Sequence, residues 1–474
     1  MKLLRAPSIF LAALLVFSGI VSSQEWAPLN RQPIFLTDTA LLLTDGTVMM
    51  HEDLSPNWWR LTPDNTGSYL NGTWSPLASM PPDYGPNDFA SAVLADGRAL
   101  VEGGEHNLGG NNETPLGAIY DPTTNTWTNV NPPSGWSEIG DSPAVVLSDG
   151  TFMLGQRSSA ATAFFNAKAL TWTLKGTGKQ DYSNEEGFNL LPDGTVLVVD
   201  TGKVPYAERY IPSLDKWISA GQTPQPLVDT YSEIGPGLLR PDGTTFYMGA
   251  SSHTAIYTPP AQFTQRGKWK AGPDFPDGNG MGDMPAAVLP DGNVLCDTFR
   301  NGGFPLHFYI FDGSKFVKAA APPGGFNPTA GHMLVLPTGQ ILFIQSDTFD
   351  VELYTAKGTY KSSWAPTVTS APSTVIRGQT YPISGTQFNG LTAGANYGDD
   401  AQMATNYPLV RITNTSTGHV FYARTHDHSS MGVATGKKKV SSHFDVPPDM
   451  ETGGSKLVVV ANGIPSQPVA VNVQ

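Results

Sequence analysis

The sequence predicts an all-β fold: a seven-bladed β-propeller followed by an immunoglobulin-like β-sandwich. Three observations support this prediction. A glycine hairpin recurs about every 50 residues, tryptophan-bearing strands lie between the hairpins, and the pattern changes near residue 366. The composition agrees, because 50 glycines and 40 prolines in 474 residues are too many turn formers for a helical protein.

The first 23 residues have the pattern of a secretory signal peptide. Lys2 and Arg5 precede an apolar run over residues 9–21, and small residues follow it before Gln24. This run is too short to cross a bilayer, and no later segment has 18 consecutive apolar residues. We therefore predict a secreted protein without a membrane span.

Charge and cysteine content narrow the function further. The formal net charge of −13 argues against a nucleic-acid partner, because a phosphate backbone needs a basic surface. It is compatible with a protein that attracts cations. The single cysteine, Cys296, cannot form an intramolecular disulfide, so we expect packing alone to stabilise the fold.

The repeat predicts the propeller blades. Seven segments place an apolar run on each side of a turn, and the turn glycines are Gly46, Gly97, Gly150, Gly194, Gly243, Gly292 and Gly339. Asp-Gly between apolar runs predicts a type I′ hairpin, a turn that needs positive φ. Most units continue with an aromatic strand and a tryptophan, which gives about four strands per unit. This period is typical of kelch-like propellers, and we place the propeller over residues 27–365.

The pattern changes after the seventh unit. Pro366 and Pro372 mark a linker, and about seven short alternating strands with irregular spacing follow. They predict an immunoglobulin-like (early-set) sandwich over residues 366–474.

This combination of propeller and sandwich resembles the galactose oxidase and glyoxal oxidase family, the copper radical oxidases. The resemblance covers essentially the whole mature chain and includes the tail "KLVVVANGIPSQPVAVNV". It implies one copper at the propeller axis, held by two tyrosines and two histidines, with one tyrosine linked to a cysteine. His332 in "TAGHMLVLPTGQ" matches one ligand, and His426 or His428 in "RTHDHSS" matches the ligand from a C-terminal-domain loop.

The chain departs from that family at the redox residues. Gly331 stands where one tyrosine is expected, and Asp88 or Phe89 stands where the cross-linked tyrosine is expected. No cysteine precedes the first hairpin, and Cys296 lies in the sixth repeat. Alcohol oxidation at a single copper needs a second redox centre, which the family supplies as that tyrosine. We therefore expect no radical-copper chemistry here.

Acidic residues precede the innermost strands. Counting back from each turn glycine gives Asp38, Asp88, Asp141, Glu185 or Glu186, Glu233 and Asp283, with His332 in the last repeat. If the innermost strands run in one direction, these side chains converge on one mouth of the channel. Like charges held together repel, so such a ring needs a cation, shared protons or open water. The alternative is that these carboxylates only fix loops by accepting backbone N–H bonds.

The function expected from these residues is binding at the propeller mouth, with a carbohydrate or another polar small molecule as ligand. The candidate cofactor is a single metal ion: copper by the resemblance, or calcium by the carboxylate ring. The alternatives are a divergent metal-dependent oxidoreductase that uses His332 with a C-terminal-domain histidine, a carboxylate-driven hydrolase or lyase, and a protein scaffold. We further predict that one of His426 and His428, but not both, points into the mouth. His106, in a Gly/Asn-rich loop, is expected to be solvated.

Overall fold

The structure is a computed structural model that describes residues 25–300, 303–323, 331–346, 348–393 and 406–474. The expected signal peptide lies outside these residues. The regular secondary structure of the described chain is almost entirely β-strand, and its helical segments are three short 3-10 turns, η1 (Pro212–Leu214), η2 (Pro276–Gly278) and η3 (Ser362–Trp364). No helix in the described chain is long and apolar enough to span a membrane.

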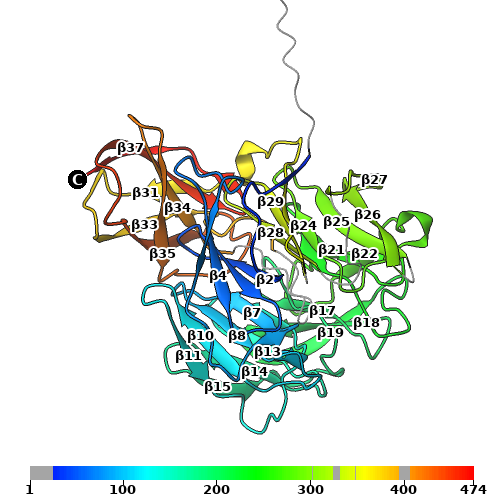
Figure 1. The fold of residues 1–474 in the computed structure, drawn as a ribbon. Helices are drawn as coiled ribbons and strands as arrows, with labels where there is room; N and C mark the ends of the chain where they lie inside the picture. The colour runs from blue at the N-terminus through cyan, green and yellow to red at the C-terminus, as the bar shows by residue number, and fades with distance from the viewer. Residues whose placement is uncertain (1–24, 301–302, 324–330, 347, 394–405) are drawn as a thin grey trace, which may run out of the picture.

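Seven four-stranded antiparallel sheets form the propeller (Figure 1). Blade 1 contains β2 (Thr37–Leu42), β3 (Val48–Glu52), β4 (Trp58–Thr62) and β5 (Thr73–Pro76). Blade 2 contains β7 (Ala90–Val93), β8 (Ala99–Glu102), β10 (Gly117–Asp121) and β11 (Thr126–Val130), with the small pair β6 (Pro86–Asn87) and β9 (His106–Asn107) beside it. Blade 3 contains β12 (Ala144–Val146), β13 (Phe152–Gly155), β14 (Thr162–Asn166) and β15 (Thr171–Lys175).

The remaining blades repeat this arrangement. Blade 4 contains β16 (Asn189–Leu190), β17 (Val196–Val199), β18 (Tyr206–Ile211) and β19 (Lys216–Gln222). Blade 5 contains β20 (Gly237–Leu239), β21 (Thr245–Met248), β22 (Thr254–Thr258) and β23 (Lys268–Ala271). Blade 6 contains β24 (Ala286–Val288), β25 (Val294–Arg300), β26 (Gly303–Phe311) and β27 (Phe316–Lys318). Blade 7 contains β28 (Gly331–Val335), β29 (Ile341–Gln345), β30 (Val351–Tyr354) and the N-terminal strand β1 (Trp26–Pro28).

One edge strand of each blade lies innermost, next to the central channel. Strands β2, β7, β12, β16, β20, β24 and β28 contact their neighbours in sequence, and β28 contacts β2. The ring is therefore closed, and Figure 1 shows the blue N-terminal blade beside β28 and β29 of the last blade. Strand β1 completes blade 7 by pairing with β30, with Trp26 opposite Tyr354.

The hairpin turns differ from the predicted type I′. The glycine of each turn has positive φ, as at Gly46, where φ is 75°, but the preceding aspartates are absent from the residues with positive φ. In the first turn, the N–H of Gly46 donates to the carbonyl of Leu43, and the N–H of Leu43 donates to the carbonyl of Thr47. This is a type I turn followed by a glycine bulge, the common three-residue hairpin connection. The aspartate contributes its side chain instead, since Asp45 Oδ1 accepts the N–H of Thr47 at 3.0 Å.

Tryptophans of the outermost strands join neighbouring blades. The indole N–H of Trp74, Trp127, Trp172 and Trp269 donates to a backbone carbonyl of the preceding blade or its following loop. Trp217 of blade 4 is an exception: it is 1% exposed, and its indole N–H has no hydrogen-bond partner.

Residues beyond 366 form a curled sheet of nine strands, consistent with the expected sandwich. The strands are β31 (Thr367–Ser370), β32 (Thr374–Val375), β33 (Thr380–Thr386), β34 (Leu409–Asn414), β35 (Val420–His426), β36 (Lys439–Asp445), β37 (Gly453–Ala461), β38 (Ile464–Pro465) and β39 (Val469–Val473). Its core includes Ile383, Val410, Phe444 and Leu457. Figure 1 shows these strands beside the propeller.

The C-terminal domain covers the hairpin face of the propeller. The ring of Tyr422 lies against Gly46, and Gly463 lies against Gly339. Arg424 donates to the carbonyl of Asp96 at 2.8 Å, and the N–H of Met431 donates to the carbonyl of Ser148 at 3.0 Å. The turns of four blades therefore contact one domain, which leaves the starts of the innermost strands on the opposite face.

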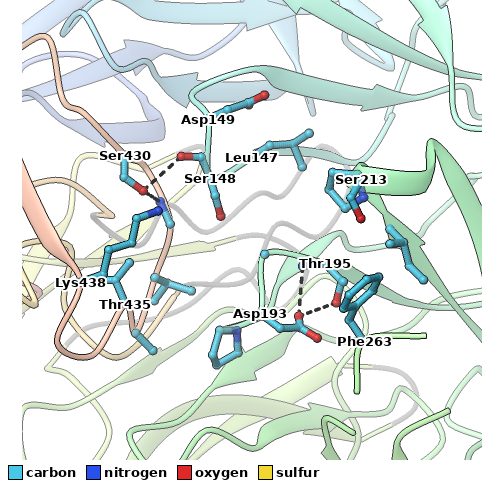
Figure 2. A pocket seen from close by; sticks show the side chains of 17 residues that line it. Leu147, Ser148, Asp149, Asp193, Thr195, Ser213, Phe263, Ser430, Thr435 and Lys438 are labelled. Carbon is cyan, nitrogen blue, oxygen red and sulfur yellow. Dashed lines mark hydrogen bonds between the residues drawn. The ribbon is translucent and has the colours of Figure 1, made fainter. Parts of the chain in front are cut away.

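A pocket of about 460 Å³ lies in the seam between the hairpins of blades 3 and 4 and the C-terminal domain. Figure 2 shows Thr435 and Lys438 on one side of this pocket and Asp193 and Phe263 on the other. The hydroxyl of Ser430 donates to the carbonyl of Ser148 at 3.2 Å, which ties the two domains together at its edge.

Candidate functional site: the acidic propeller mouth

Carboxyl groups converge where the innermost strands begin, at the face opposite the C-terminal domain. We call this the acidic mouth and define it by Asp88, Glu105, Asp141, Glu185, Glu233 and Asp283. Four of these residues belong to the positions that the sequence predicts for blades 2, 3, 5 and 6, and Glu185 belongs to blade 4. Glu105, from the loop after β8, is a further member that the strand-start pattern did not include.

Two pairs of carboxyl groups in the mouth are hydrogen-bonded to each other. Glu185 bonds to Asp141, and Asp283 bonds to Glu233. Two carboxylates this close together disfavour the ionised form of one member of each pair. Burial and the charge of Asp141 raise the pKa of Glu185, and burial and the charge of Glu233 raise the pKa of Asp283.

The pairs also interact across the channel. Glu185 is close enough to Glu233 and Asp283 for their charges to raise its pKa further, and Asp283 responds in the same way to Asp88 and Glu105. The structure therefore brings carboxyl groups from blades 2 to 6 into one electrostatic unit. Such a unit attracts cations.

Blade 2 contributes a tight group to the mouth. A carboxylate oxygen of Asp88, one of Glu105 and a ring nitrogen of His106 lie within 4.8 Å of one another. The N–H of Glu105 donates to the carbonyl of Asp88 at 3.0 Å, and β6 pairs with β9, which fixes the two segments side by side. His106 is half-buried in this group, so the expectation of a solvated loop histidine captured only part of its position.

The backbone is strained at two mouth residues. Asp88 and Glu185 both have φ of 54°, in the left-handed region that side chains other than glycine seldom adopt. Such conformations cost about 1–3 kcal/mol and persist where the surrounding structure enforces them, often at functional sites.

Arg157 is a cation inside this acidic region. Its guanidinium contacts Asp141 at 2.6 Å and Glu113 at 2.7 Å. Asp141 therefore has both a positive partner and a carboxyl partner, Glu185. Arg157 lies after the second strand of its blade, outside the strand-start positions that the sequence pattern singled out.

Asp38 and His332 lie apart from these pairs. Asp38 is buried and bonded to Nδ1 of His51 at 2.8 Å, and Nε2 of His51 lies 2.6 Å from the carbonyl of Ser55. His332 is 5% exposed, with Nε2 3.3 Å from the hydroxyl of Thr39 and no hydrogen-bond partner on Nδ1. Burial lowers the pKa of His332, although the charge of Asp38 opposes this shift. Asp38 is thus tied within blade 1.

Glu186 does not face the mouth. It is buried and lies 2.8 Å from Nζ of Lys179 in the outer part of blade 4. The sequence left Glu185 and Glu186 as alternatives, and the fold separates them at a turn, where Glu185 has φ of 54° and the chain changes direction.

The C-terminal histidines have their hydrogen-bond partners in their own domain and at a propeller hairpin. His426 bonds to Asp427 at 2.8 Å and Asp445 at 3.1 Å, within the C-terminal domain. His428 is buried, bonds to the hydroxyl of Ser442 at 2.9 Å, and is anchored by its N–H to the carbonyl of Ala95. Ala95 belongs to a hairpin, so both histidines lie at the covered face, whereas the mouth lies at the opposite ends of the innermost strands. Domain docking decides this placement, and the loop sequence does not reveal it.

Comparison with known proteins supports the fold. No protein-family model matches the chain, and neither does any curated protein sequence. Among solved structures, a fungal alcohol oxidase of the AA5 family, in complex with copper, is 15% identical with a TM-score of 0.55. The match covers 95% of this chain and 98% of that one. The chain has the galactose-oxidase fold.

A second similar structure matches a smaller share of this chain. A catalytically inactive virginiamycin B lyase from Staphylococcus aureus, with quinupristin, is 7% identical with a TM-score of 0.50. It covers 70% of this chain and 99% of that one. At these identities both comparisons concern the fold alone.

The described residues do not fit the copper centre implied by the galactose-oxidase fold. Cys296 is fully buried inside blade 6, where its thiol contacts the carbonyl of Tyr309, so it is not placed to cross-link to a mouth residue. Phe89 is fully buried beside His51 and Trp58, and Asp88 is half-buried in the mouth. His332 contacts Thr39, and neither His426 nor His428 joins it. The carboxyl groups of the acidic mouth suit the binding of a cation, and they cannot store a radical as the family's cross-linked tyrosine does.

Proposed function

We propose that this chain is a secreted binding protein of the galactose-oxidase fold whose acidic mouth takes a cation or a polar ligand such as a carbohydrate. In this proposal it performs no radical-copper oxidation. The observation that carries the proposal is the convergence of carboxyl groups from five blades, whose mutual charges and burial raise the pKa of Glu185 and Asp283. A ligand with a positive charge or several hydroxyl donors would satisfy acceptors that now compete for protons.

The Asp88, Glu105 and His106 group favours the cation branch of this proposal. Two carboxylates and an imidazole within 4.8 Å are a donor set that first-row transition metals use, and calcium could use only the two carboxylates. The hydroxyl-bearing ligand remains the second branch, because neutral carboxyl groups of the pairs can also donate to sugar oxygens.

Isothermal titration calorimetry tests both branches. Calcium, manganese and copper salts, and neutral and amino sugars, are titrated into chelator-treated protein. We expect saturable binding of at least one cation or sugar, and an affinity at least tenfold lower in Asp283→Asn and in Glu105→Gln. Asp149→Asn, at a hairpin on the opposite face, serves as the matched control and is expected to bind as the wild type does.

Two outcomes would overturn the proposal. Wild-type protein that binds none of these ligands at millimolar concentration would leave the mouth as a solvated loop cluster. Production of hydrogen peroxide from alcohols or aldehydes by copper-loaded protein would show that radical-copper oxidation had been dismissed incorrectly.

A further inference from the structure

A second acidic cluster lies in the outer part of blade 4, away from the ring of innermost strands. Carboxylate oxygens of Asp181, Glu186 and Asp200 lie within 4.8 Å of one another. All three residues are buried, with exposed fractions of 3%, 0% and 1%. Burying three carboxyl groups together is costly unless positive charge or donors compensate for the lost water.

The compensation in this cluster is incomplete. Lys179 lies 2.8 Å from Glu186 and 3.7 Å from Glu208, a fourth buried carboxylate. Its ammonium also donates to the carbonyls of Asp181 and Tyr182, which uses its remaining capacity. One ammonium therefore faces four carboxyl groups.

Backbone donors satisfy some of the remaining oxygens. Oδ2 of Asp181 accepts the N–H groups of Gly202 and Lys203, and Glu208 accepts those of Gln180 and Asp181. These bonds hold Asp181 and Glu208 in fixed positions. They contribute nothing to Asp200.

Asp200 is the carboxyl group that points to a missing ligand. Its Oδ1 is buried without a hydrogen-bond partner. Asp200 lines a pocket of about 730 Å³ together with Glu208 and Trp217. Trp217 is itself buried with an unpartnered indole N–H, whereas the corresponding tryptophans of four other blades donate to a neighbouring blade. Two residues that line this pocket thus each have a buried polar atom without a partner, Oδ1 of Asp200 and the indole N–H of Trp217.

We propose that Asp181, Glu186 and Asp200 bind a divalent cation of the calcium class on the inner wall of this blade 4 pocket. The three side chains offer oxygen alone, without histidine or cysteine, and hard cations such as calcium prefer oxygen ligands. Of the three ligands, Asp200 lines the pocket, which gives the ion access from that side and leaves room for water ligands. The site is separate from the acidic mouth and does not depend on the proposed function.

Terbium luminescence tests the site, because Tb³⁺ replaces calcium and is sensitised by a nearby indole. Trp217 is close to the cluster: Nζ of Lys179 lies 5.5 Å from its ring centroid. In chelator-treated protein excited at the tryptophan band, we expect saturable Tb³⁺ emission that calcium displaces. Asp200→Asn, which keeps the side-chain shape, should weaken Tb³⁺ binding at least tenfold. Trp217→Phe should lose the emission but retain calcium in equilibrium dialysis.

The mouth variant Asp283→Asn separates the two sites. We expect it to leave unchanged the part of the calcium-displaceable emission that Trp217→Phe abolishes. Emission that is lost in Asp283→Asn and retained in Asp200→Asn would place the ion at the mouth and overturn this proposal. Equal calcium binding by wild type and a folded Asp200→Asn, checked by circular dichroism, would overturn it as well, as would no binding by the wild type.

Discussion

Several carboxyl groups outside the acidic mouth are buried without full hydrogen bonding. Glu102 is completely buried and has no hydrogen-bond partner on either oxygen, and Glu352 is 2% exposed with an unpartnered Oε2. Burial raises the pKa of Glu102 well above its ordinary value, and burial followed by the charge of Asp350 raises that of Glu352 to about 8. Burial therefore favours the protonated form of both side chains.

Glu352→Gln should change how stability depends on pH. Folding raises the pKa of Glu352 from 4.5 to about 8, so the proton stabilises the folded state fully below pH 4.5. That stability is lost as the pH rises to about 8, by up to about 1.4 kcal/mol per pH unit. Glutamine carries no such proton, so the variant should lose less stability than the wild type between pH 5 and 8. Urea unfolding at both pH values measures this, and parallel losses would contradict it.

At the scale of the element, the hairpin turn explains the repeat. Each Asp-Gly turn places glycine alone at positive φ and uses the aspartate side chain to accept a backbone N–H, as Asp242 does for Thr244 at 3.0 Å. These requirements involve only residues next to each other in the chain. The hairpins could therefore be predicted from seven short segments of sequence. The turn type could not be read, because both hairpin types accept Asp-Gly.

Gly243 allows the backbone requirement to be measured by itself. Its φ is 81°, and a β-carbon at this position would meet no atom within 4 Å. Gly243→Ala should therefore destabilise the protein by about 1–2 kcal/mol through strain alone. Gly243→Asn should cost less, since asparagine tolerates this conformation better. Chemical denaturation compares the two variants, and equal stability of Gly243→Ala and the wild type would contradict the assigned turn.

At the scale of the molecule, the N-terminal strand closes the ring. Trp26 is 3% exposed, its indole N–H donates to the carbonyl of Ala320 at 2.7 Å, and its ring contacts Phe308, Phe343 and Tyr354. A single residue thus joins the first strand, blade 6 and blade 7. No disulfide supplements this closure, since Cys296 is the sole cysteine.

Trp26→Ala should therefore destabilise the whole propeller. Removing a large buried aromatic side chain costs about 3–5 kcal/mol, which here also loosens the closing pair β1–β30. Trp269→Ala, which removes a partly buried tryptophan from an outermost strand, provides the comparison and should cost less. Urea unfolding followed by far-ultraviolet circular dichroism measures both. A smaller loss for Trp26→Ala than for Trp269→Ala would contradict the proposed role of β1 in closure.

The sequence by itself determined the repeat, the blade count and the acidic positions at the strand starts, because turns and alternating strands depend on neighbouring residues. It therefore led to Asp88, Asp141, Glu233 and Asp283. It offered no means of finding Glu105 or Arg157, which reach the mouth from other parts of their blades.

The tertiary structure decided which candidate side chains face one another. It directs Glu185 to the mouth and Glu186 to Lys179, and it places His428 against the hairpin of Ala95. The physical reason is that the direction of a side chain depends on the strand register and on how distant segments dock. A shift of one residue reverses the face that a strand residue presents, and no local pattern in the sequence records how the two domains meet.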